Sequence, residues 1–304
     1  MRRLAERLTL LSIRQDDGAE TLGIRTPQGI LDVRSVAARF SLPAPQTLES
    51  MLRESRGAEL EAIMHHALAA GDAALFRPEA SIRHGRLFTH PEKIVCVGLN
   101  YRRHAAEVGA QPPRFPPLFS KFANALAPHG GTIVLPPPEI ATQFDYETEL
   151  VAVIGRPARN VSEHEALTYI AGYCVGHDFS ARDLQMELPA GQWLVGKSLD
   201  GFAPVGPYFV SADLVGNPDR LAISTRVNGE LRQSSNTSDF IFTMPQLVAY
   251  ISRYWTLMPG DLIFTGTPEG VILGYPEAQR RWLKAGDEIV SAIEKLGELK
   301  FRLS

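Results

Sequence analysis

Short apolar runs bounded by glycine, proline and polar residues are the feature that most restricts the fold of this chain. Runs of this length, rich in branched and aromatic side chains, are typical of strands rather than of helices. Six of them are strand candidates: Ile94 to Val97, Glu147 to Ile154, Tyr173 to Phe179, Ala222 to Val227, Leu262 to Thr265 and Glu288 to Ile293. Asn228-Gly229, directly after the fourth run, favours a type I′ hairpin turn. The pattern predicts an α+β fold that is mainly β.

Two segments between these runs have the spacing of helices. The first, "SEHEALTYIAGY", begins with Ser162 and Glu165 at the positions of a capping box. The second is "TMPQLVAYISRYW", in which four apolar residues share one helical face: Leu247, Val248, Ile251 and Trp255.

The N-terminal part has its own pattern of short β-type runs, from Leu8 to Val33, followed by helical stretches around Ser35 to Phe40 and Leu48 to Ala70. A polar, proline-containing segment over residues 77–93 then precedes the strand candidate at Ile94. We therefore predict a small α+β accessory domain over residues 1–88 and a larger, β-rich domain over residues 89–304.

Composition excludes several classes of protein. The chain has 304 residues, 44% of them hydrophobic and 21% charged, which is enough for a sizeable core. Its formal net charge is −3 and its basic residues are scattered, so nucleic acid is not an expected partner. No apolar run approaches the ~20 residues of a membrane span, so no membrane association is expected.

The cellular location follows from the N-terminus and the two cysteines. Glu6 and Arg7 interrupt any apolar stretch after the basic start, and no small-residue cleavage site follows, so no export signal is predicted. Cys96 and Cys174 both lie in apolar, strand-like runs, where a buried thiol is commoner than a disulfide. We expect a cytoplasmic protein.

A titratable pair follows the first apolar run of the larger domain. In "NYRRHAAEVG", His104 and Glu107 are three residues apart, so a helix would place them on one face as an acid-base pair. The alternative is a solvated helix face on which both residues, with Arg102 and Arg103, only contact water. The spacing alone leaves both interpretations open.

Carboxylates elsewhere in the chain favour the functional interpretation. Asp145, Glu147 and Glu149 alternate in "FDYETELVAVIG", and a strand would place all three on one face. An exposed acidic face is the alternative, but the strand continues into an apolar run that is typical of a core. Asp178 ends another apolar run, where its alternative role is that of a turn or capping residue. Three such carboxylates would make a hard oxygen site for Mg²⁺ or Mn²⁺.

Seven motifs make the chain similar to the bacterial, two-part members of the fumarylacetoacetate hydrolase family. In order they are "VGLNYRRHAAEVG", "PPLFSKFANAL", "DYETEL", "GYCVGHDFSARDLQ", "GKSLDGFAPVGP", "VNGELRQSSNTSDFIF" and "MPGDLIFTGTPEGV". The resemblance covers about Ile94 to the C-terminus, and the part before it is similar only as a small accessory domain. It implies a catalytic domain of the family's mixed β-roll or barrel-like type.

The resemblance also implies a role for individual residues. Glu147, Glu149 and Asp178 match the metal ligands, whereas Asp145 is not expected to bind the metal directly. His104 and Glu107 match a water-activating dyad on a mobile lid, and Lys197 matches a lysine that faces the reacting carbonyl group. Arg182, Gln185 and Thr267 match residues that contact the substrate. Each of the last four residues has an alternative interpretation without a role in catalysis. Lys197 would be a surface lysine and Arg182 a partner of Asp183. Gln185 would be a solvated helix residue and Thr267 a turn residue.

The activity implied is metal-dependent hydrolysis of a carbon-carbon bond in a 2,4-dioxo acid, such as an acylpyruvate, fumarylpyruvate or a 2,4-dioxo-3-deoxy sugar acid. Relatives with the same acids decarboxylate oxaloacetate or isomerise unsaturated diacids, and a non-catalytic protein that binds metal and a small acid is a further alternative. A homodimer is expected from the family.

The sequence departs from the family pattern at two positions. His177 replaces an asparagine that commonly precedes the metal-binding aspartate, and Ile272 replaces a glycine after "TGTPEGV". We expect His177 to support the site from behind or to alter the metal preference, and Ile272 to narrow or redirect the pocket. The proline-rich loop from Ala110 to Pro138, with Phe115, Phe119 and Phe122, is expected to shape specificity.

Overall fold

The computed structural model describes residues 7–188 and 191–304, and its largest sheet has eleven strands. Ten of them are neighbours in the order β4 (Phe76–Arg77), β3 (Gly29–Asp32), β2 (Glu20–Thr26), β1 (Thr9–Arg14), β13 (Ala203–Ser211), β11 (Ile170–His177), β10 (Thr148–Ile154), β16 (Leu262–Phe264), β5 (Ile94–Val97) and β6 (Leu118–Ser120). β7 (Leu126–Ala127) pairs with β13 outside this order. The order is open, so these strands do not close into a barrel.

Two smaller sheets complete the β-structure of the described residues. The first has the order β15 (Glu230–Asn236), β14 (Ala222–Val227), β17 (Glu288–Ile293), β18 (Gly297–Leu303) and β8 (Thr132–Ile133), and the second pairs β12 (Ser180–Ala181) with β9 (Phe144–Asp145). At the turn between β14 and β15, Asn228 has φ of 51° and Gly229 has φ of 83°. Two consecutive positive φ values are what a type I′ turn requires, so the predicted hairpin is confirmed.

The helices are mostly short: α1 (Val33–Phe40), α2 (Leu48–Arg53), α3 (Gly57–Ala70), α4 (Arg102–Glu107), α5 (Glu163–Ala166), α6 (Arg182–Met186), α7 (Leu194–Lys197), α8 (Ala212–Val215) and α9 (Met244–Tyr254). The predicted helix from Leu48 to Ala70 is in fact two helices, because Ser55 has a positive φ of 56° that a continuous helix excludes. The mixed α+β, mainly β fold is confirmed.

Two predictions about helices are wrong in detail. The Ser162 hydroxyl donates to the Glu165 carboxylate at 2.8 Å, so these side chains bind each other and do not form a capping box. The end of that predicted helix, from Ile170 onward, belongs to β11, because strand pairing with β10 and β13 outweighs its helical spacing. α9 buries Leu247, Val248 and Ile251 as predicted, but Trp255 follows the last turn and is 45% exposed.

The large sheet separates two apolar cores. Alternate side chains of β10 point to opposite faces, so Leu150 packs in a core with Ile289 and Phe301 of the five-stranded sheet. Val151 packs on the other face, in a core that includes Leu48 and Leu60 of the N-terminal helices. The central strands β10, β11 and β13 are therefore buried along their whole length. Within the described residues, every helix is too short or too polar to cross a membrane.

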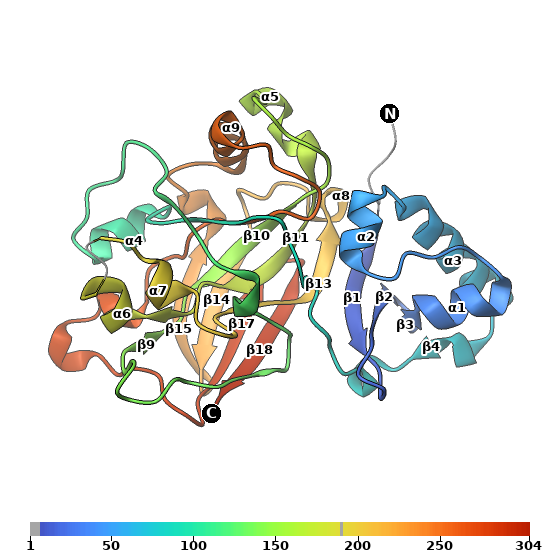
Figure 1. The fold of residues 1–304 in the computed structure, drawn as a ribbon, viewed down its shortest axis with the longest axis horizontal. Helices are drawn as coiled ribbons and strands as arrows, with labels where there is room; N and C mark the ends of the chain where they lie inside the picture. The colour runs from blue at the N-terminus through green and yellow to red at the C-terminus, as the bar shows by residue number, and fades with distance from the viewer. Residues whose placement is uncertain (1–6, 189–190) are drawn as a thin grey trace.

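The N-terminal unit continues the same sheet. β1 pairs with β13 in antiparallel register, with Leu10 opposite Phe209, so β1 to β4 extend the sheet of the larger unit. Figure 1 shows α1, α2 and α3 at one end of the molecule and α4, α6 and α7 at the other. The division at residue 88 into two domains stays a prediction, and the sheet crosses it.

Candidate active site

Strand register brings distant carboxylates to one edge of the large sheet. β10 and β11 are antiparallel, with Thr148 opposite His177 and Glu149 opposite Gly176, so the start of β10 lies beside the end of β11. The Asp178 N–H donates to the Glu147 carbonyl oxygen at 3.0 Å and closes this end of the ladder. Glu147 and Glu149 consequently lie next to Asp178.

The three acids form a compact cluster. Glu147, Glu149 and Asp178 are all buried, and one oxygen from each lies within 4.8 Å of the others. Asp145 is not part of this cluster, because the strand is interrupted between β9 and β10 and the Asp145 carboxylate binds Arg182 instead. The expectation that Asp145 does not bind the metal directly stays a prediction.

Three cations surround these acids. Lys197 Nζ lies 2.7 Å from Glu147 Oε2 and 2.9 Å from Asp178 Oδ2. Lys121 Nζ lies 2.6 Å from Asp178 Oδ1. Arg182 Nη2 lies 2.7 Å from Glu147 Oε1 and 2.8 Å from Asp145 Oδ2. The carboxylates here are those of Asp145, Glu147, Glu149 and Asp178. If all four are ionised, they carry one more charge than the three cations balance.

Glu149 is the carboxylate of the four that has no ion pair with these cations. Burial raises the pKa of the Glu149 carboxyl group well above 4.5, and the neighbouring charges of Asp178 and Glu147 raise it further. Burial also opposes ionisation of Glu147, but Lys197 and Arg182 outweigh it and lower the pKa of Glu147. Burial lowers the pKa of Lys197, but the charges of Asp178 and Glu147 raise it. The net effect is a raised pKa. Lys197 is therefore a cation at neutral pH.

The acid cluster fits a divalent cation. The Gly266 N–H donates to Glu149 Oε2 at 2.8 Å, and no other donor among the described residues bonds to this carboxylate. Ionised carboxylate oxygens accept more than one partner, so those bound to lysine or arginine still have lone pairs for a metal. A 2+ charge would remove the repulsion that raises the pKa of Glu149, and hard oxygen ligands are those that Mg²⁺ and Mn²⁺ prefer.

The His104–Glu107 pair is formed as the spacing predicts. α4 places His104 Nδ1 3.2 Å from Glu107 Oε2, and the other oxygen, Oε1, accepts from the Gly270 N–H at 2.8 Å. A Cβ atom on Gly274 would lie 2.2 Å from Glu107 Cδ, so the absence of a side chain there leaves room for the carboxyl group. His104 is buried, which rules out the solvated-face interpretation for this residue.

The turn before α4 is held by the neighbouring strand. β5 and β16 are parallel, so both chains leave the sheet at the edge where the acids lie. Asn100 Nδ2 donates to the Thr265 carbonyl oxygen at 2.8 Å, and Asn100 Oδ1 accepts from the Phe242 N–H at 2.8 Å. These bonds fix the start of α4 relative to the acid cluster. Motion of α4 as a lid stays a prediction.

One cavity of about 400 Å³ contains all of the predicted site residues. They are His104, Glu107, Glu147, Glu149, Asp178, Arg182, Gln185, Lys197 and Thr267. Apolar side chains, among them Phe119, Trp193 and Leu273, form much of the remaining wall. Of the aromatic residues expected to shape specificity, only Phe119 lines this cavity, whereas Phe115 and Phe122 are 57% and 56% exposed.

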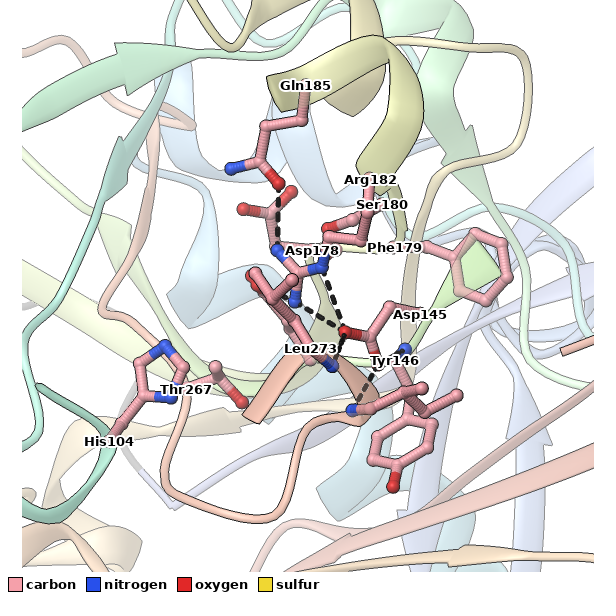
Figure 2. A network of polar contacts seen from close by, with 12 residues as sticks. His104, Asp145, Tyr146, Asp178, Phe179, Ser180, Arg182, Gln185, Thr267 and Leu273 are labelled. Carbon is pink, nitrogen blue, oxygen red and sulfur yellow. Dashed lines mark hydrogen bonds and ion pairs between the residues drawn. The ribbon is translucent and has the colours of Figure 1, made fainter. Parts of the chain in front are cut away.

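Arg182 joins two parts of the site. Its Nη1 donates to Gln185 Oε1 at 2.8 Å and its Nε donates to Asp145 Oδ2 at 2.8 Å. Asp145 also accepts the backbone N–H groups of Ile272 and Leu273 at 2.8 and 3.0 Å. Figure 2 shows Asp145 between Arg182 and Leu273, with Gln185 at the far end of the guanidinium group. Asp145 therefore links Arg182 to the segment that carries Leu273.

The two departures from the family pattern lie behind the cavity. His177 Nδ1 accepts from the Glu147 N–H at 3.3 Å, and Nε2 lies 3.1 Å from Thr148 Oγ1. Burial lowers the pKa of His177 to about 3, so the ring is neutral and holds the backbone of a predicted ligand. Ile272 packs in the core, and its neighbour Leu273 is the one that lines the cavity.

Two further residues are defined by their contacts in the folded chain: Thr267, whose partners were not predicted, and Lys121, which was not assigned to the site. The Thr267 hydroxyl donates to the Thr148 carbonyl oxygen at 3.0 Å and accepts from Gln233 Nε2 at 2.9 Å, so it has protein partners inside the cavity wall. Lys121 is absent from the predicted site, although it is buried against Asp178. The family's lysine-bearing loop, matched by "PPLFSKFANAL", is the signal that could have assigned it.

The chain is similar in sequence to known proteins. The family profile described as Fumarylacetoacetate (FAA) hydrolase C-terminal matches residues 93–304. The mitochondrial oxaloacetate tautomerase FAHD2B of Bos taurus is 40% identical over 269 residues, which are 88% of this chain and 82% of the relative.

Two solved structures are similar in fold and sequence. The crystal structure of a putative HpcE protein from Mycobacterium smegmatis has a TM-score of 0.80 and 36% identity, over 96% of this chain and 98% of that one. Fumarylpyruvate hydrolase from Pseudomonas aeruginosa, in complex with Mn²⁺ and pyruvate, has a TM-score of 0.63 and 39% identity, over 70% of this chain and 89% of that one. The chain therefore belongs to the fumarylacetoacetate hydrolase family.

Proposed function

We propose that this chain catalyses a metal-dependent proton transfer at carbon 3 of a 2-oxo dicarboxylic acid, the interconversion of the keto and enol forms of oxaloacetate. The observation that carries the proposal is that the His104–Glu107 pair and the acid cluster line one cavity. A base beside a hard-cation site suits removal of a proton next to a carbonyl group. The similarity to oxaloacetate tautomerases supports the same reaction.

The residues divide the work as follows. Glu147, Glu149 and Asp178 would hold a divalent cation, which would supply positive charge near the 2-oxo group. His104 takes the proton from carbon 3, and the electron pair of that C–H bond moves toward the carbonyl oxygen. Glu107 orients the imidazole ring and stabilises its protonated form. Lys197 holds Glu147 and Asp178 in place and adds positive charge to this side of the cavity.

Hydrolysis of a carbon-carbon bond in a 2,4-dioxo acid is the second candidate. The similarity to the fumarylpyruvate hydrolase that binds Mn²⁺ and pyruvate favours it, and the wall formed by Phe119 and Trp193 offers an apolar surface to an acyl group. His104 would then take its proton from water, which attacks the carbonyl group.

Decarboxylation of oxaloacetate needs the same acids but no water activation. A purely binding protein has no need of a base, so the His104–Glu107 pair argues against that alternative.

Direct assays separate these reactions. The purified protein should accelerate the decay of enol oxaloacetate in the presence of Mg²⁺ or Mn²⁺, beyond the rate with metal alone, and a chelator should abolish the effect. Parallel assays follow cleavage of fumarylpyruvate and acetylpyruvate and release of CO₂ from oxaloacetate. Cleavage of a dioxo acid without any acceleration of tautomerisation would replace the first candidate with the second.

We also propose a homodimer, on the basis of the family. Val134 lies near the end of the predicted specificity loop, and Ile140 follows it. Both are large, exposed apolar residues of the kind that subunit contacts cover. Sedimentation at micromolar concentration is expected to give twice the 33.4 kDa mass of the chain, and a strictly monomeric mass would contradict the proposal.

A further inference from the structure

A cation of the cavity has no part in the chemistry described above. Arg280 lines the same cavity as the acid cluster, from the segment that follows Leu273 and Gly274. Its side chain is partly buried, and its Nε donates to the Tyr275 carbonyl oxygen at 3.0 Å. This bond holds one side of the guanidinium group and leaves the two Nη groups for another partner.

Arg280 differs from the other cations of the cavity in its partners. Arg182 binds Asp145 and Glu147, and Lys197 binds Glu147 and Asp178. Among residues 7–188 and 191–304, no carboxylate forms an ion pair with Arg280, and the bond to Tyr275 is the only hydrogen bond that its side chain donates. A partly buried guanidinium group without an acidic partner is suited to bind a carboxylate in two parallel hydrogen bonds.

The adjacent residue makes a natural comparison. Arg281 is exposed and does not line the cavity, and its Nη1 donates to the carbonyl oxygens of Ala278 and Arg280 at 3.1 and 3.0 Å. The two arginines have the same charge and nearly the same sequence position. Of the two, Arg280 alone lines the cavity.

We infer that Arg280 binds the distal carboxylate of the substrate and thereby selects dicarboxylic over monocarboxylic 2-oxo acids. This inference rests on the proposed function in one respect, because it assumes that the 1-carboxylate and 2-oxo groups face the acid cluster. The acid cluster, with the cation that it would hold, then faces the reacting end, which all 2-oxo acids share. Arg280 recognises the second charge, which only diacids carry, and so determines specificity without acting on the reacting atoms.

The experiment compares matched ligands and matched variants. Isothermal titration calorimetry with Mg²⁺-loaded protein measures the affinity for 2-oxoglutarate and for 2-oxopentanoate, which differ by one carboxylate in place of a methyl group. The proteins are the wild type, Arg280→Ala, Arg280→Lys and Arg281→Ala. Oxaloacetate tautomerisation is measured separately, so that KM and kcat are known for each protein.

The wild type is expected to bind the diacid on the order of 10- to 100-fold more tightly than the monoacid, the range for a charge-assisted hydrogen-bonded pair. Arg280→Ala should remove this preference, raise KM for oxaloacetate by a similar factor and change kcat little. Arg280→Lys should restore part of the preference, because it keeps the charge and loses the paired geometry. Arg281→Ala should behave as the wild type.

Three results would overturn the inference. They are equal affinities of the wild type for the two ligands, an unchanged preference in Arg280→Ala, and an equal loss in Arg281→Ala. If Arg280 only holds the turn at Tyr275, both ligands should weaken together in Arg280→Ala and the preference should persist, which also contradicts the inference. Absence of tautomerase activity in a wild type that still prefers the diacid would contradict the proposed reaction and leave the role of Arg280 supported.

Discussion

At the scale of single residues, His104 has the most direct test. General-base catalysis by a positioned side chain contributes on the order of 10²- to 10⁴-fold, so His104→Ala should lower kcat by about that factor. Metal affinity should stay nearly constant, because His104 is outside the acid cluster. Glu107→Gln should have a milder effect in the same direction. His164→Ala, which changes an exposed histidine on α5, is the control, and a loss of less than about threefold in His104→Ala would exclude the base role.

Glu149 makes metal affinity depend on pH in a defined direction. Burial and the charges of Asp178 and Glu147 raise its pKa above 4.5 in the metal-free protein, so a proton competes with the metal for this carboxylate. Affinity for Mg²⁺ or Mn²⁺ should therefore increase as pH rises through the raised pKa, by up to about tenfold per pH unit. Glu149→Gln should bind the metal more weakly and with a flatter pH dependence. Metal titrations at a series of pH values check this, and a pH-independent affinity of the wild type would refute it.

The same shift affects stability. Because the folded metal-free protein holds this proton more tightly than the unfolded chain, its free energy of unfolding falls as pH rises from about 4.5 through the raised pKa. A bound divalent cation removes this cost. The increase in melting temperature on adding metal should accordingly be larger at the upper end of that pH range.

At the scale of elements, the segment over residues 270–274 positions α4. It includes the Gly270 N–H that binds Glu107, and Gly274, which leaves space for the Glu107 carboxyl group. Gly274→Ala should displace that carboxyl group, weaken its contact with His104 and lower kcat at least as far as Glu107→Gln does. Metal affinity and the melting temperature should change little.

A double variant separates this mechanism from a general disturbance. If Gly274→Ala acts through Glu107, adding it to Glu107→Gln should cost much less than it does in the wild type, because both changes remove one interaction. Steady-state kinetics of the four proteins measure this coupling. Additive losses in kcat would show that the alanine acts elsewhere.

At the scale of the whole molecule, the sheet that runs through both units predicts mutual dependence. Removing residues 1–88 would expose the edge of β13 that β1 covers. It would also remove Leu10, Leu48 and Leu60 from the core that Val151 and Phe209 share. An unpaired, apolar strand edge promotes aggregation. We expect the remaining fragment to be insoluble or to unfold without a cooperative transition, as measured by circular dichroism during heating, and a soluble, active fragment would show that the two units are independent.

Local patterns in the sequence were sufficient for features whose partners are close along the chain. Asn228-Gly229 specifies its turn because both residues tolerate positive φ. His104 and Glu107 meet because one helical turn brings residues three apart together. The short apolar runs around Val95 and Leu150 are strands, as their length and branched side chains predict. Backbone geometry alone relates such residues, so their spacing is informative.

Contacts between distant segments were decided by the tertiary structure. Glu149 meets Asp178 only through the β10–β11 register, and Lys121 reaches Asp178 across 57 residues of sequence. Ile170 and Gly172 lie in a predicted helix but in an actual strand, because pairing with neighbouring strands outweighs local spacing. The family motifs named most of the site, yet Arg280 lies outside them, and only the folded chain places it in the cavity. Register and packing depend on all parts of the chain at once, which is why no local pattern encodes them.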